Sequence, residues 1–256
     1  MDKPAFDRRD WIAGLEKGLR IIEAFNDINQ RLTASTAARR TGITRTAARR
    51  YLHTLQHLGY LESDGQLFWL TPRVLRLGWS FLDSARITRA VQPHLQRISA
   101  AVGGAAYFAV LDEDDVIYVA RDGATCLRNV GFVLGAPVSP NVSSAGIALL
   151  SCCSGKRVNR WLMKQRRFVP ITPYTVTTRE GVRSLIEGAR HKGYALLEQQ
   201  LEPKLRGIAV PIHSHSGRTV GAISVSLAME SESPEHAVAR ALPRLREAEY
   251  SLLASL

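Results

Sequence analysis

Residues 33–58 read TASTAARRTGITRTAARRYLHTLQHL and determine the fold of the first part of the chain. Thr33 and Thr44 stand where they can each cap a helix, because a threonine hydroxyl accepts a hydrogen bond from a first-turn N–H group. We therefore expect one helix over residues 34–40 and a second over residues 45–58.

The connection between these two helices is the tight turn Thr41-Gly42-Ile43. Gly42 can adopt a positive φ at low steric cost, and Ile43 can fill the space beneath the turn. Two helices joined by a short turn that contains glycine indicate a helix-turn-helix.

Six arginines and no acidic residue lie between Arg31 and Tyr60. A helix surface that meets only water usually mixes both signs of charge, because opposite charges four residues apart stabilise it. A simple helix pair would leave this arginine cluster unexplained, whereas the second helix of a helix-turn-helix enters the major groove of DNA. Arginine can bind guanine there, and threonine can bind a phosphate or a thymine methyl group. The predicted DNA-contacting residues are Thr33, Ser35, Thr44, Arg45, Thr46, Arg49, Arg50 and Gln66.

Further elements complete a predicted winged helix-turn-helix domain over residues 11–71. Asp64-Gly65 between two apolar runs predicts a hairpin, which would form the wing. A first amphipathic helix is indicated by the helical spacing of Leu15, Leu19, Ile22 and Phe25. The expected inner face of the second helix of the motif is Ala48, Leu52, Leu55 and Leu58.

A linker helix is expected over residues 72–87. Thr71-Pro72 begins it with a capping residue and a proline at the first helical position, where the missing N–H group costs nothing. The helix is too apolar for a solvated connector, with Val74, Leu77, Phe81 and Ala85 on one face and Leu75, Trp79 and Leu82 beside it. We expect it to pack on the same helix of a second subunit, which would also supply two DNA half-sites.

The remaining chain, residues 88–256, mixes helices and strands. A helix over residues 88–102 precedes strand-like runs at residues 105–111, 116–121, 127–134, 194–198, 207–213 and 220–227, and a helix follows Ser233-Pro234 with an interruption or kink near Pro243. The pattern predicts an α+β sensor-like domain.

Composition narrows the functional classes. The formal charge of +11 favours a polyanionic partner. No apolar run is long enough to span a bilayer and the first residues lack the apolar core of a signal peptide, so a cytoplasmic location without membrane association is expected.

Cysteine occurs only at positions 126, 152 and 153, which argues against a disulfide framework or a zinc ribbon. The adjacent Cys152-Cys153 fits either a redox sensor or, more commonly, two small buried residues at a helix end.

The second domain shows the features of a binding site rather than of an enzyme. It has no GxSxG, phosphate-binding loop, dinucleotide fingerprint or metal signature, so no cofactor, no metal and no catalytic residue are predicted. Candidate ligand residues are the small hydroxyl residues Ser143, Ser144, Ser224 and Ser226. They are expected beside the strand Gly207-Ile208-Ala209, where Gly207 and Ala209 leave space for a ligand. Arg128 and Arg206 are candidates to bind a carboxylate.

Several segments resemble the IclR family of regulators. They are residues 14–22 (GLEKGLRII), 46–55 (TAARRYLHTL), 70–78 (LTPRVLRLG), 193–195 (GYA), 205–211 (LRGIAVP) and 223–226 (ISVS). Residues 49–55 are most similar to the subgroup that controls aromatic-acid catabolism, the protocatechuate and 4-hydroxybenzoate regulators. The resemblance implies a GAF-like effector domain, and homodimers that can pair into tetramers on operator DNA. It also implies effector contacts from Ser143, Ser144 and Ala145, from Leu197 and Glu198, from Gly207, Ile208 and Ala209, and from Ser224 and Ser226.

Two departures from the family pattern bear on the ligand. The loop that often ends in a basic residue reads Val142-Ser143-Ser144-Ala145-Gly146-Ile147 here, and Gly207 stands where serine or cysteine is usual. The pocket therefore has one polar group fewer and more room, which favours an aromatic carboxylate over a two- or three-carbon acid. The predicted function is effector-responsive transcriptional regulation of an aromatic-acid degradation operon. The alternatives are another small-organic-acid pathway, a ligand-processing enzyme with an accessory DNA-binding domain, and a structural DNA binder with little sequence preference.

Overall fold

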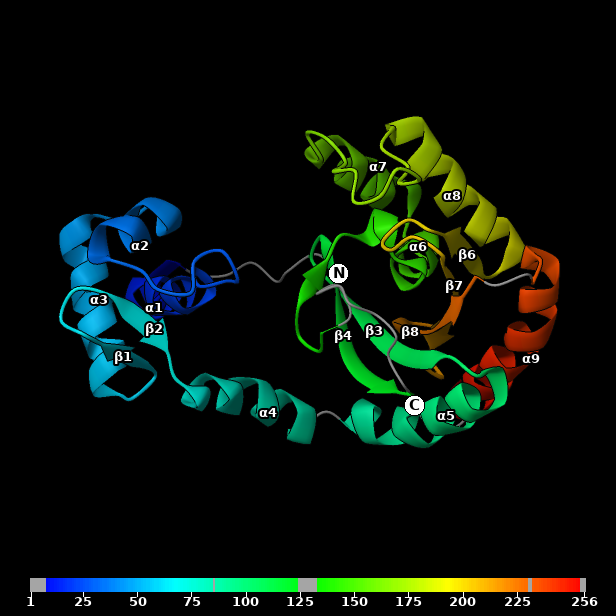
Figure 1. The fold of residues 1–256 in the computed structure, drawn as a ribbon, viewed down its shortest axis with the longest axis horizontal. Helices are drawn as coiled ribbons and strands as arrows, with labels where there is room; N and C mark the ends of the chain where they lie inside the picture. Colours follow the sequence, from blue (N-terminus) through cyan, green and yellow to red (C-terminus); the bar gives the residue numbers. More distant parts are fainter. Residues whose placement is uncertain (1–7, 85, 124–132, 230–231, 254–256) are drawn as a thin grey trace. The chain divides into compact units, whose positions relative to one another are not determined.

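The computed structural model describes residues 8–84, 86–123, 133–229 and 232–253, and it divides into two compact units, Met1–Asp83 and Ser84–Leu256 (Figure 1). Each unit has a hydrophobic core of its own. None of the helices in the described ranges is long and apolar enough to cross a membrane.

The first unit is a helix-turn-helix with a two-stranded wing (Figure 1). Its elements are a short 3-10 helix (Arg8–Asp10), α1 (Ala13–Glu23), α2 (Ala34–Thr41), α3 (Arg45–His57), β1 (Leu61–Ser63), β2 (Phe68–Leu70), a 3-10 turn (Pro72–Val74) and α4 (Leu75–Ser84). The strands pair antiparallel, and Leu32 adds a single bridge to Phe68. This arrangement confirms the predicted fold of the N-terminal part.

The predicted caps and turns of this unit are confirmed. The Thr33 hydroxyl accepts a hydrogen bond from the Thr36 N–H group at 3.2 Å, and the Thr44 hydroxyl accepts one from Ala47 at 3.3 Å. Gly42 has a φ of 69°, so α2 ends in the left-handed conformation. At the wing, an Asp64 carboxylate oxygen accepts bonds from the Gln66 and Leu67 N–H groups. Local sequence thus specifies both helix starts and both turns.

Two predicted apolar faces differ from the structure. In α1 the buried residue is Ile21, while Leu15 and Leu19 are 62% and 45% exposed, because α1 meets the core through its C-terminal part. On α3 Ala48, Leu52 and Leu55 are buried as expected, but Leu58 lies just beyond the helix end and is 48% exposed.

The connector also differs from the single helix predicted over residues 72–87. A 3-10 turn precedes α4, and α5 (Arg86–Val102) begins two residues before the helix that was expected at residue 88. Leu75, Leu77 and Trp79 of α4 are 75%, 45% and 66% exposed within the chain.

The second unit is an α+β domain built on a six-stranded antiparallel sheet of order β5-β4-β3-β8-β7-β6. The strands are β3 (Ala105–Asp112), β4 (Asp115–Asp122), β5 (Pro137–Val138), β6 (Ala195–Glu198), β7 (Leu205–His213) and β8 (Thr219–Ala228). The helices are α5, the 3-10 helix η4 (Pro140–Val142), α6 (Ser144–Ser151), α7 (Gly155–Lys164), α8 (Arg179–Lys192) and α9 (Pro234–Leu253).

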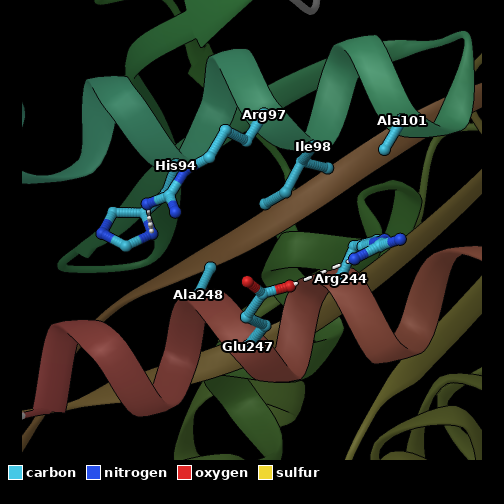
Figure 2. A pocket seen from close by; sticks show the side chains of 7 residues that line it. All are labelled: His94, Arg97, Ile98, Ala101, Arg244, Glu247 and Ala248. Carbon is cyan, nitrogen blue, oxygen red and sulfur yellow. Dashed lines mark hydrogen bonds and ion pairs between the residues drawn. The ribbon is translucent and has the colours of Figure 1, made fainter.

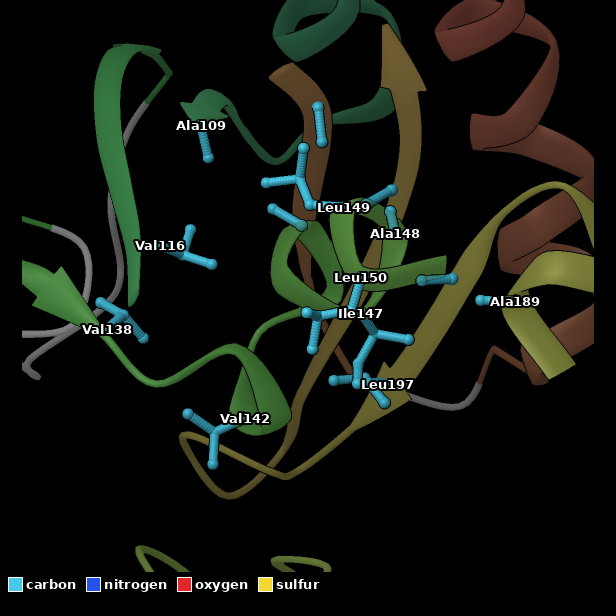
Figure 3. Packing of buried hydrophobic residues seen from close by; sticks show 14 of the residues in the cluster. Ala109, Val116, Val138, Val142, Ile147, Ala148, Leu149, Leu150, Ala189 and Leu197 are labelled. Carbon is cyan, nitrogen blue, oxygen red and sulfur yellow. The ribbon is translucent and has the colours of Figure 1, made fainter. Parts of the chain in front are cut away.

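The two faces of this sheet carry different cores. One core joins α5 and α9 to Ile208, Val210, Ile223 and Val225 of the central strands. The other lies beneath α6, α7 and α8 and contains Ile147, Leu150 and Leu197 (Figure 3). Since strand residues alternate between faces, neighbouring residues of β7 and β8 belong to different cores.

Two elements predicted for the second unit differ from the structure. Most of the run expected as a strand over residues 127–134 lies outside the described residues, and Val133 and Leu134 are not in a strand. The last helix continues through Pro243 from Pro234 to Leu253, so of the two predicted alternatives the interruption is wrong and the kink stays a prediction.

Truncation of the α3 core tests this packing. Leu52→Ala should destabilise the N-terminal unit by about 2–5 kcal/mol, because Leu52 is fully buried and its loss leaves a cavity. Leu58→Ala, the matched control near the end of the same helix, should cost less than about 0.5 kcal/mol. Urea unfolding of the full chain, followed by helical circular dichroism, measures both. Equal losses would contradict the described core.

Candidate functional site

The first candidate site is the outward surface of α3. Thr44, Arg45, Thr46, Arg49 and Arg50 are all exposed. Positions 45 and 49 are one turn apart, so their side chains lie on the same stripe of the helix. The other side of α3 is held in the core, and this leaves the arginine-bearing side facing solvent.

The charge of this surface is not neutralised within the chain. Among the described residues, no acidic side chain forms an ion pair with Arg39, Arg40, Arg45, Arg49 or Arg50. Arg31 is used differently, since its guanidinium stacks 4.4 Å from the Trp69 ring at the base of the wing. Five cationic side chains on α2 and α3 are therefore available to an external anion.

The remaining predicted DNA-contacting residues lie on α2 and the wing. Ser35 is exposed in the first turn of α2, and Thr33 is half-buried because its hydroxyl caps that helix. Gln66 is exposed beside the wing turn. The turn's N–H groups, chiefly that of Leu67, lower the pKa of Asp64, so this carboxylate stays charged while it fixes the shape of the wing tip.

The second candidate site is a small cavity of about 20 Å³ between α6 and the sheet. Cross-strand register sets its floor, because Leu197, Gly207 and Ser226 are direct partners on β6, β7 and β8. The walls combine apolar and hydroxyl side chains, and the lining residues are Tyr118, Val142, Ser143, Ser144, Leu197, Gln200, Leu201, Leu205, Gly207 and Ser226.

Two hydroxyl groups meet at the N-terminus of α6. The Tyr118 hydroxyl lies 2.8 Å from Ser143 Oγ, which also accepts a hydrogen bond from the Gly146 N–H group at 3.2 Å. Burial raises the pKa of Tyr118 far above its ordinary value, so the phenol is neutral at physiological pH. The cavity thus presents neutral hydrogen-bonding groups beside the positive end of a helix dipole.

Gly207 makes the close approach of α6 possible. A Cβ atom at this position would lie 2.7 Å from Ser144 Oγ, closer than van der Waals contact allows. The absence of a side chain at Gly207 therefore creates the room that the Ser144 hydroxyl occupies.

The structure separates the predicted effector residues into three groups. Ser143, Ser144, Leu197, Gly207 and Ser226 line the cavity. Ala145, Ala209 and Ser224 are buried on the same side of the sheet without lining it. The Ile208 side chain belongs to the opposite core and Glu198 pairs with Arg206, while Arg128 lies outside the described residues.

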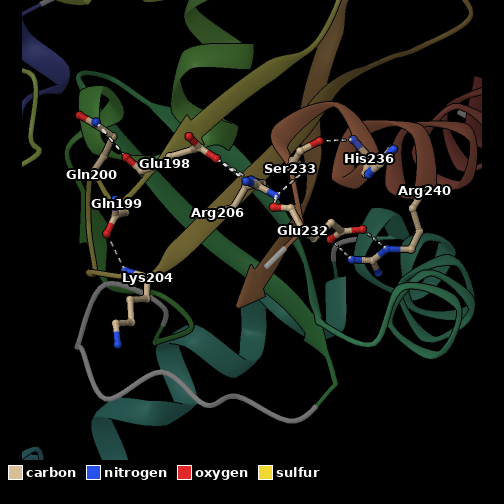
Figure 4. A network of polar contacts seen from close by, with 9 residues as sticks. All are labelled: Glu198, Gln199, Gln200, Lys204, Arg206, Glu232, Ser233, His236 and Arg240. Carbon is tan, nitrogen blue, oxygen red and sulfur yellow. Dashed lines mark hydrogen bonds and ion pairs between the residues drawn. The ribbon is translucent and has the colours of Figure 1, made fainter. Parts of the chain in front are cut away.

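Arg206 is not available to a ligand carboxylate, contrary to the sequence prediction. It is 2% exposed, its Nε donates to Glu198 Oε1 at 2.6 Å, and its Nη1 donates to the Glu232 and Ser233 carbonyls at 3.1 Å (Figure 4). Strand alternation places it on the side away from the cavity. Its role is to join β6 and β7 to the segment that leads into α9.

Sequence reasoning missed Tyr118 and Val142, the loop residues Gln200 and Leu201, and Leu205 at the start of β7. Gln200 holds that loop through bonds from its Nε2 to the Tyr174 and Glu198 carbonyls and from the Val176 N–H group to its Oε1. The Thr175 hydroxyl donates to the Gln200 carbonyl at 2.8 Å. The neighbours of Tyr118 on β4, Ile117 and Val119, belong to the other core, and the pairing of β4 beside β3 brings Tyr118 to α6.

A larger hollow of about 240 Å³ lies between α5 and α9 (Figure 2). Its charged groups already interact, since Arg97 Nη2 lies 3.1 Å from His94 Nδ1 and Arg244 pairs with Glu247 at 3.4 Å. Burial, with the Arg97 charge, lowers the pKa of His94. The cavity beneath α6 is the better candidate for a ligand site, because its polar groups are buried and converge.

Two family models together match nearly the whole chain. The IclR helix-turn-helix domain matches residues 14–65, and the bacterial transcriptional regulator IclR C-terminal domain matches residues 79–252. The chain belongs to the IclR family of bacterial transcriptional regulators. The helix-turn-helix of such a regulator binds DNA, and its C-terminal domain binds a small effector.

Individual relatives extend along most of the chain. It is 37% identical over 242 residues to the p-hydroxybenzoate hydroxylase transcriptional activator of Acinetobacter baylyi, covering 93% of this chain and 89% of that protein. It is 35% identical over 248 residues to the Pca regulon regulatory protein of Pseudomonas putida, covering 95% and 84%. A crystal structure of an IclR homolog from Microbacterium hydrocarbonoxydans, complexed with 4-hydroxybenzoate, is similar with a TM-score of 0.75 and 25% identity, covering 95% and 100%.

Removal of the buried arginine tests its structural role. Arg206→Gln should lower the free energy of unfolding of the C-terminal unit by about 2–4 kcal/mol, since it leaves Glu198 and two carbonyls without their cation. Arg244→Gln makes the same change at an exposed pair and should cost less than about 1 kcal/mol. Thermal unfolding of the two variants gives the comparison. A stable Arg206→Gln variant with weakened effector binding would favour a ligand role instead.

Proposed function

We propose that this IclR-family regulator controls an operon for the degradation of an aromatic carboxylic acid and responds to that acid or a close relative. The exposed, unpaired arginine surface of α3 carries the DNA-binding part of the proposal. The names of the relatives in Acinetobacter and Pseudomonas, together with the cavity beneath α6, support the choice of effector class.

For DNA binding, we propose that the N-terminal part of α3 lies in the major groove. Arg45, Arg49 and Arg50 would contact base edges and phosphates, and Thr44 and Thr46 would contact the backbone or a thymine methyl group. Thr33 and Ser35 at the start of α2 and Gln66 on the wing would contact flanking phosphates. All of these side chains except the half-buried Thr33 are exposed, and the three arginines have no ionic partner among the described residues.

Arg49→Gln should weaken operator binding at least about tenfold and reduce the slope of log affinity against log salt by about 1, because one charge-assisted contact is lost. Arg244→Gln removes the same charge from the C-terminal unit and should leave both quantities unchanged. Fluorescence anisotropy with labelled operator DNA at several salt concentrations measures them. If Arg49→Gln binds as tightly as the parent, α3 is not the reading helix.

We propose that the second copy of this chain covers the apolar surface of α1 and α4. The exposed apolar side chains are Ile12, Leu15 and Leu19 on the first segment and Leu75, Leu77 and Trp79 on the second. So much exposed apolar surface within one small unit is typical of a protein interface. A dimer also presents two recognition helices to two half-sites, and dimers of dimers would form the tetramer.

An apolar-to-charged substitution tests this interface. Leu75→Asp should shift the chain toward monomer at micromolar concentration, because it places a carboxylate in the proposed contact. Met163→Asp makes a like change at a residue of α7 that is 69% exposed and should not alter the mass. Sedimentation velocity separates the species. If the unsubstituted chain is monomeric at this concentration, the proposed interface is wrong.

For the effector, we propose an aromatic carboxylate in the cavity beneath α6. Its carboxylate would take hydrogen bonds from the Tyr118, Ser143 and Ser144 hydroxyls and from the first N–H groups of α6, and its ring would contact Leu197 and Leu201. The cavity measures only about 20 Å³, far below the roughly 300–1,000 Å³ of typical ligand pockets. Binding of a ring therefore requires side chains such as Leu201 to move.

Tyr118→Phe should weaken 4-hydroxybenzoate binding about tenfold, because one hydrogen bond to a charged group is lost. Tyr174→Phe removes a hydroxyl from a tyrosine that is 56% exposed and should leave the affinity unchanged. Isothermal titration with 4-hydroxybenzoate and protocatechuate, after a thermal-shift panel that includes short aliphatic acids, measures this. If an aliphatic acid binds more strongly than both aromatic acids, the chain regulates the pathway of another organic acid.

We further propose that the chain performs no chemistry on its effector and acts in the cytoplasm, where operator DNA is reached. 4-Hydroxybenzoate incubated with the pure protein should be recovered unchanged, as measured by liquid chromatography. Conversion would favour the alternative of an enzyme with an accessory DNA-binding domain.

A further inference from the structure

A thiol, an imidazole and a carboxylate meet at the C-terminal end of α6. Cys152 is exposed at this end, and its Sγ lies 3.8 Å from His213 Nε2 at the end of β7. The other ring nitrogen of His213 lies 3.9 Å from Glu249 Oε1 on α9. Three elements distant in sequence therefore place a proton acceptor beside an accessible thiol and a carboxylate behind that acceptor.

The carboxylate of this cluster is itself held in position. Arg246 Nη1 donates to Glu249 Oε2 at 2.6 Å, and Arg246 Nη2 donates to the Gly193 carbonyl at 2.8 Å. A base that is oriented by a third group is the arrangement that activates a nucleophile.

Arg190 holds the carbonyl groups at the C-terminal end of α6. Its Nε donates to the Ser151 carbonyl at 2.8 Å and its Nη2 to the Cys153 carbonyl at 2.9 Å, so a cation lies against the two residues that flank Cys152.

The adjacent cysteine provides an internal contrast. Cys153 is half-buried, its thiol donates to the Leu149 carbonyl at 3.6 Å, and burial raises its pKa. Cys153 therefore fits the packing role that sequence suggested for both residues, whereas the exposed Cys152 does not.

A shared metal does not account for the cluster. His213 directs one nitrogen to Cys152 and the other to Glu249, so the three groups cannot reach one ion at bonding distance. No group of three His, Cys, Asp or Glu side chains among the described residues could hold a metal ion.

We propose that Cys152 is a peroxide-reactive thiol, with His213 as its proton carrier and Glu249 as the residue that orients His213. His213 takes the thiol proton, and the thiolate sulfur attacks one oxygen of hydrogen peroxide. An S–O bond forms as the O–O bond breaks, and the leaving hydroxide takes the proton from His213 to become water. Sulfur is oxidised by two electrons to a sulfenic acid, and peroxide is reduced by two.

The test uses the full chain with Cys126→Ser, since that cysteine lies outside the described residues. Hydrogen peroxide is added, dimedone traps the sulfenic acid, and peptide mass spectrometry reports the rate at each cysteine. Cys152 should react at least about tenfold faster than Cys153. Cys153→Ser should leave the Cys152 rate unchanged, and Cys152→Ser should abolish the fast phase.

The role of His213 is tested with two reagents. His213→Gln should slow the peroxide reaction about a hundredfold and the iodoacetamide reaction less, because iodide needs no proton to leave. Glu249→Gln, which retains the side-chain shape, should slow the peroxide reaction by a smaller factor. Thermal unfolding of each variant establishes that it is folded.

Three outcomes would overturn the proposal: equal rates at Cys152 and Cys153, an unchanged peroxide rate in both His213→Gln and Glu249→Gln, or equal slowing of peroxide and iodoacetamide in these variants. The assay contains neither DNA nor effector, so its result is independent of the proposed regulatory function.

Discussion

The close packing of α6 on β7 and β8 is the constraint on which the C-terminal domain depends. One side of these strands carries small residues, among them Gly207, Ala209 and Ser226, and the other side carries branched apolar residues. A helix can approach a sheet this closely only where side chains are small, as the near contact of Ser144 with Gly207 illustrates. The same approach brings the N-terminus of α6 to the cavity and its C-terminus to His213.

Arginine has two opposite uses in this chain, and burial distinguishes them. Arg206 is enclosed with Glu198 and two carbonyls because an unpaired charge inside the protein would be unstable. The α3 arginines face water, where leaving a charge without a partner costs little. The net positive charge is therefore informative only when the structure separates arginines that hold the fold from arginines available to a ligand.

The described lining of the cavity beneath α6 contains no cationic side chain. Recognition of a carboxylate by neutral hydroxyls and helix N–H groups is physically reasonable, because each group is already oriented by the fold. The Gln200 bonds and the threonine bonds around residues 172–175 hold the loop above this cavity. Movement of that loop and of its leucines would thus accompany entry of a ring.

The sequence was sufficient to predict a feature wherever the interactions that form it join residues close together in the chain. Caps at Thr33 and Thr44, the positive φ at Gly42 and the Asp64-Gly65 turn arise from hydrogen bonds between residues a few positions apart, and the α3 arginine surface follows from helical periodicity. The pattern of small residues also gave Ser143, Ser144, Gly207 and Ser226 of the cavity, and the family resemblance added Leu197. Tertiary structure decided which side of a strand each residue faces, and so assigned Arg206 and Glu198 to an ion pair and Tyr118 to the cavity. It also exposed Leu15 and Cys152, which sequence had placed inside. These outcomes depend on strand register and helix docking between segments far apart in the chain, and no local pattern encodes such contacts.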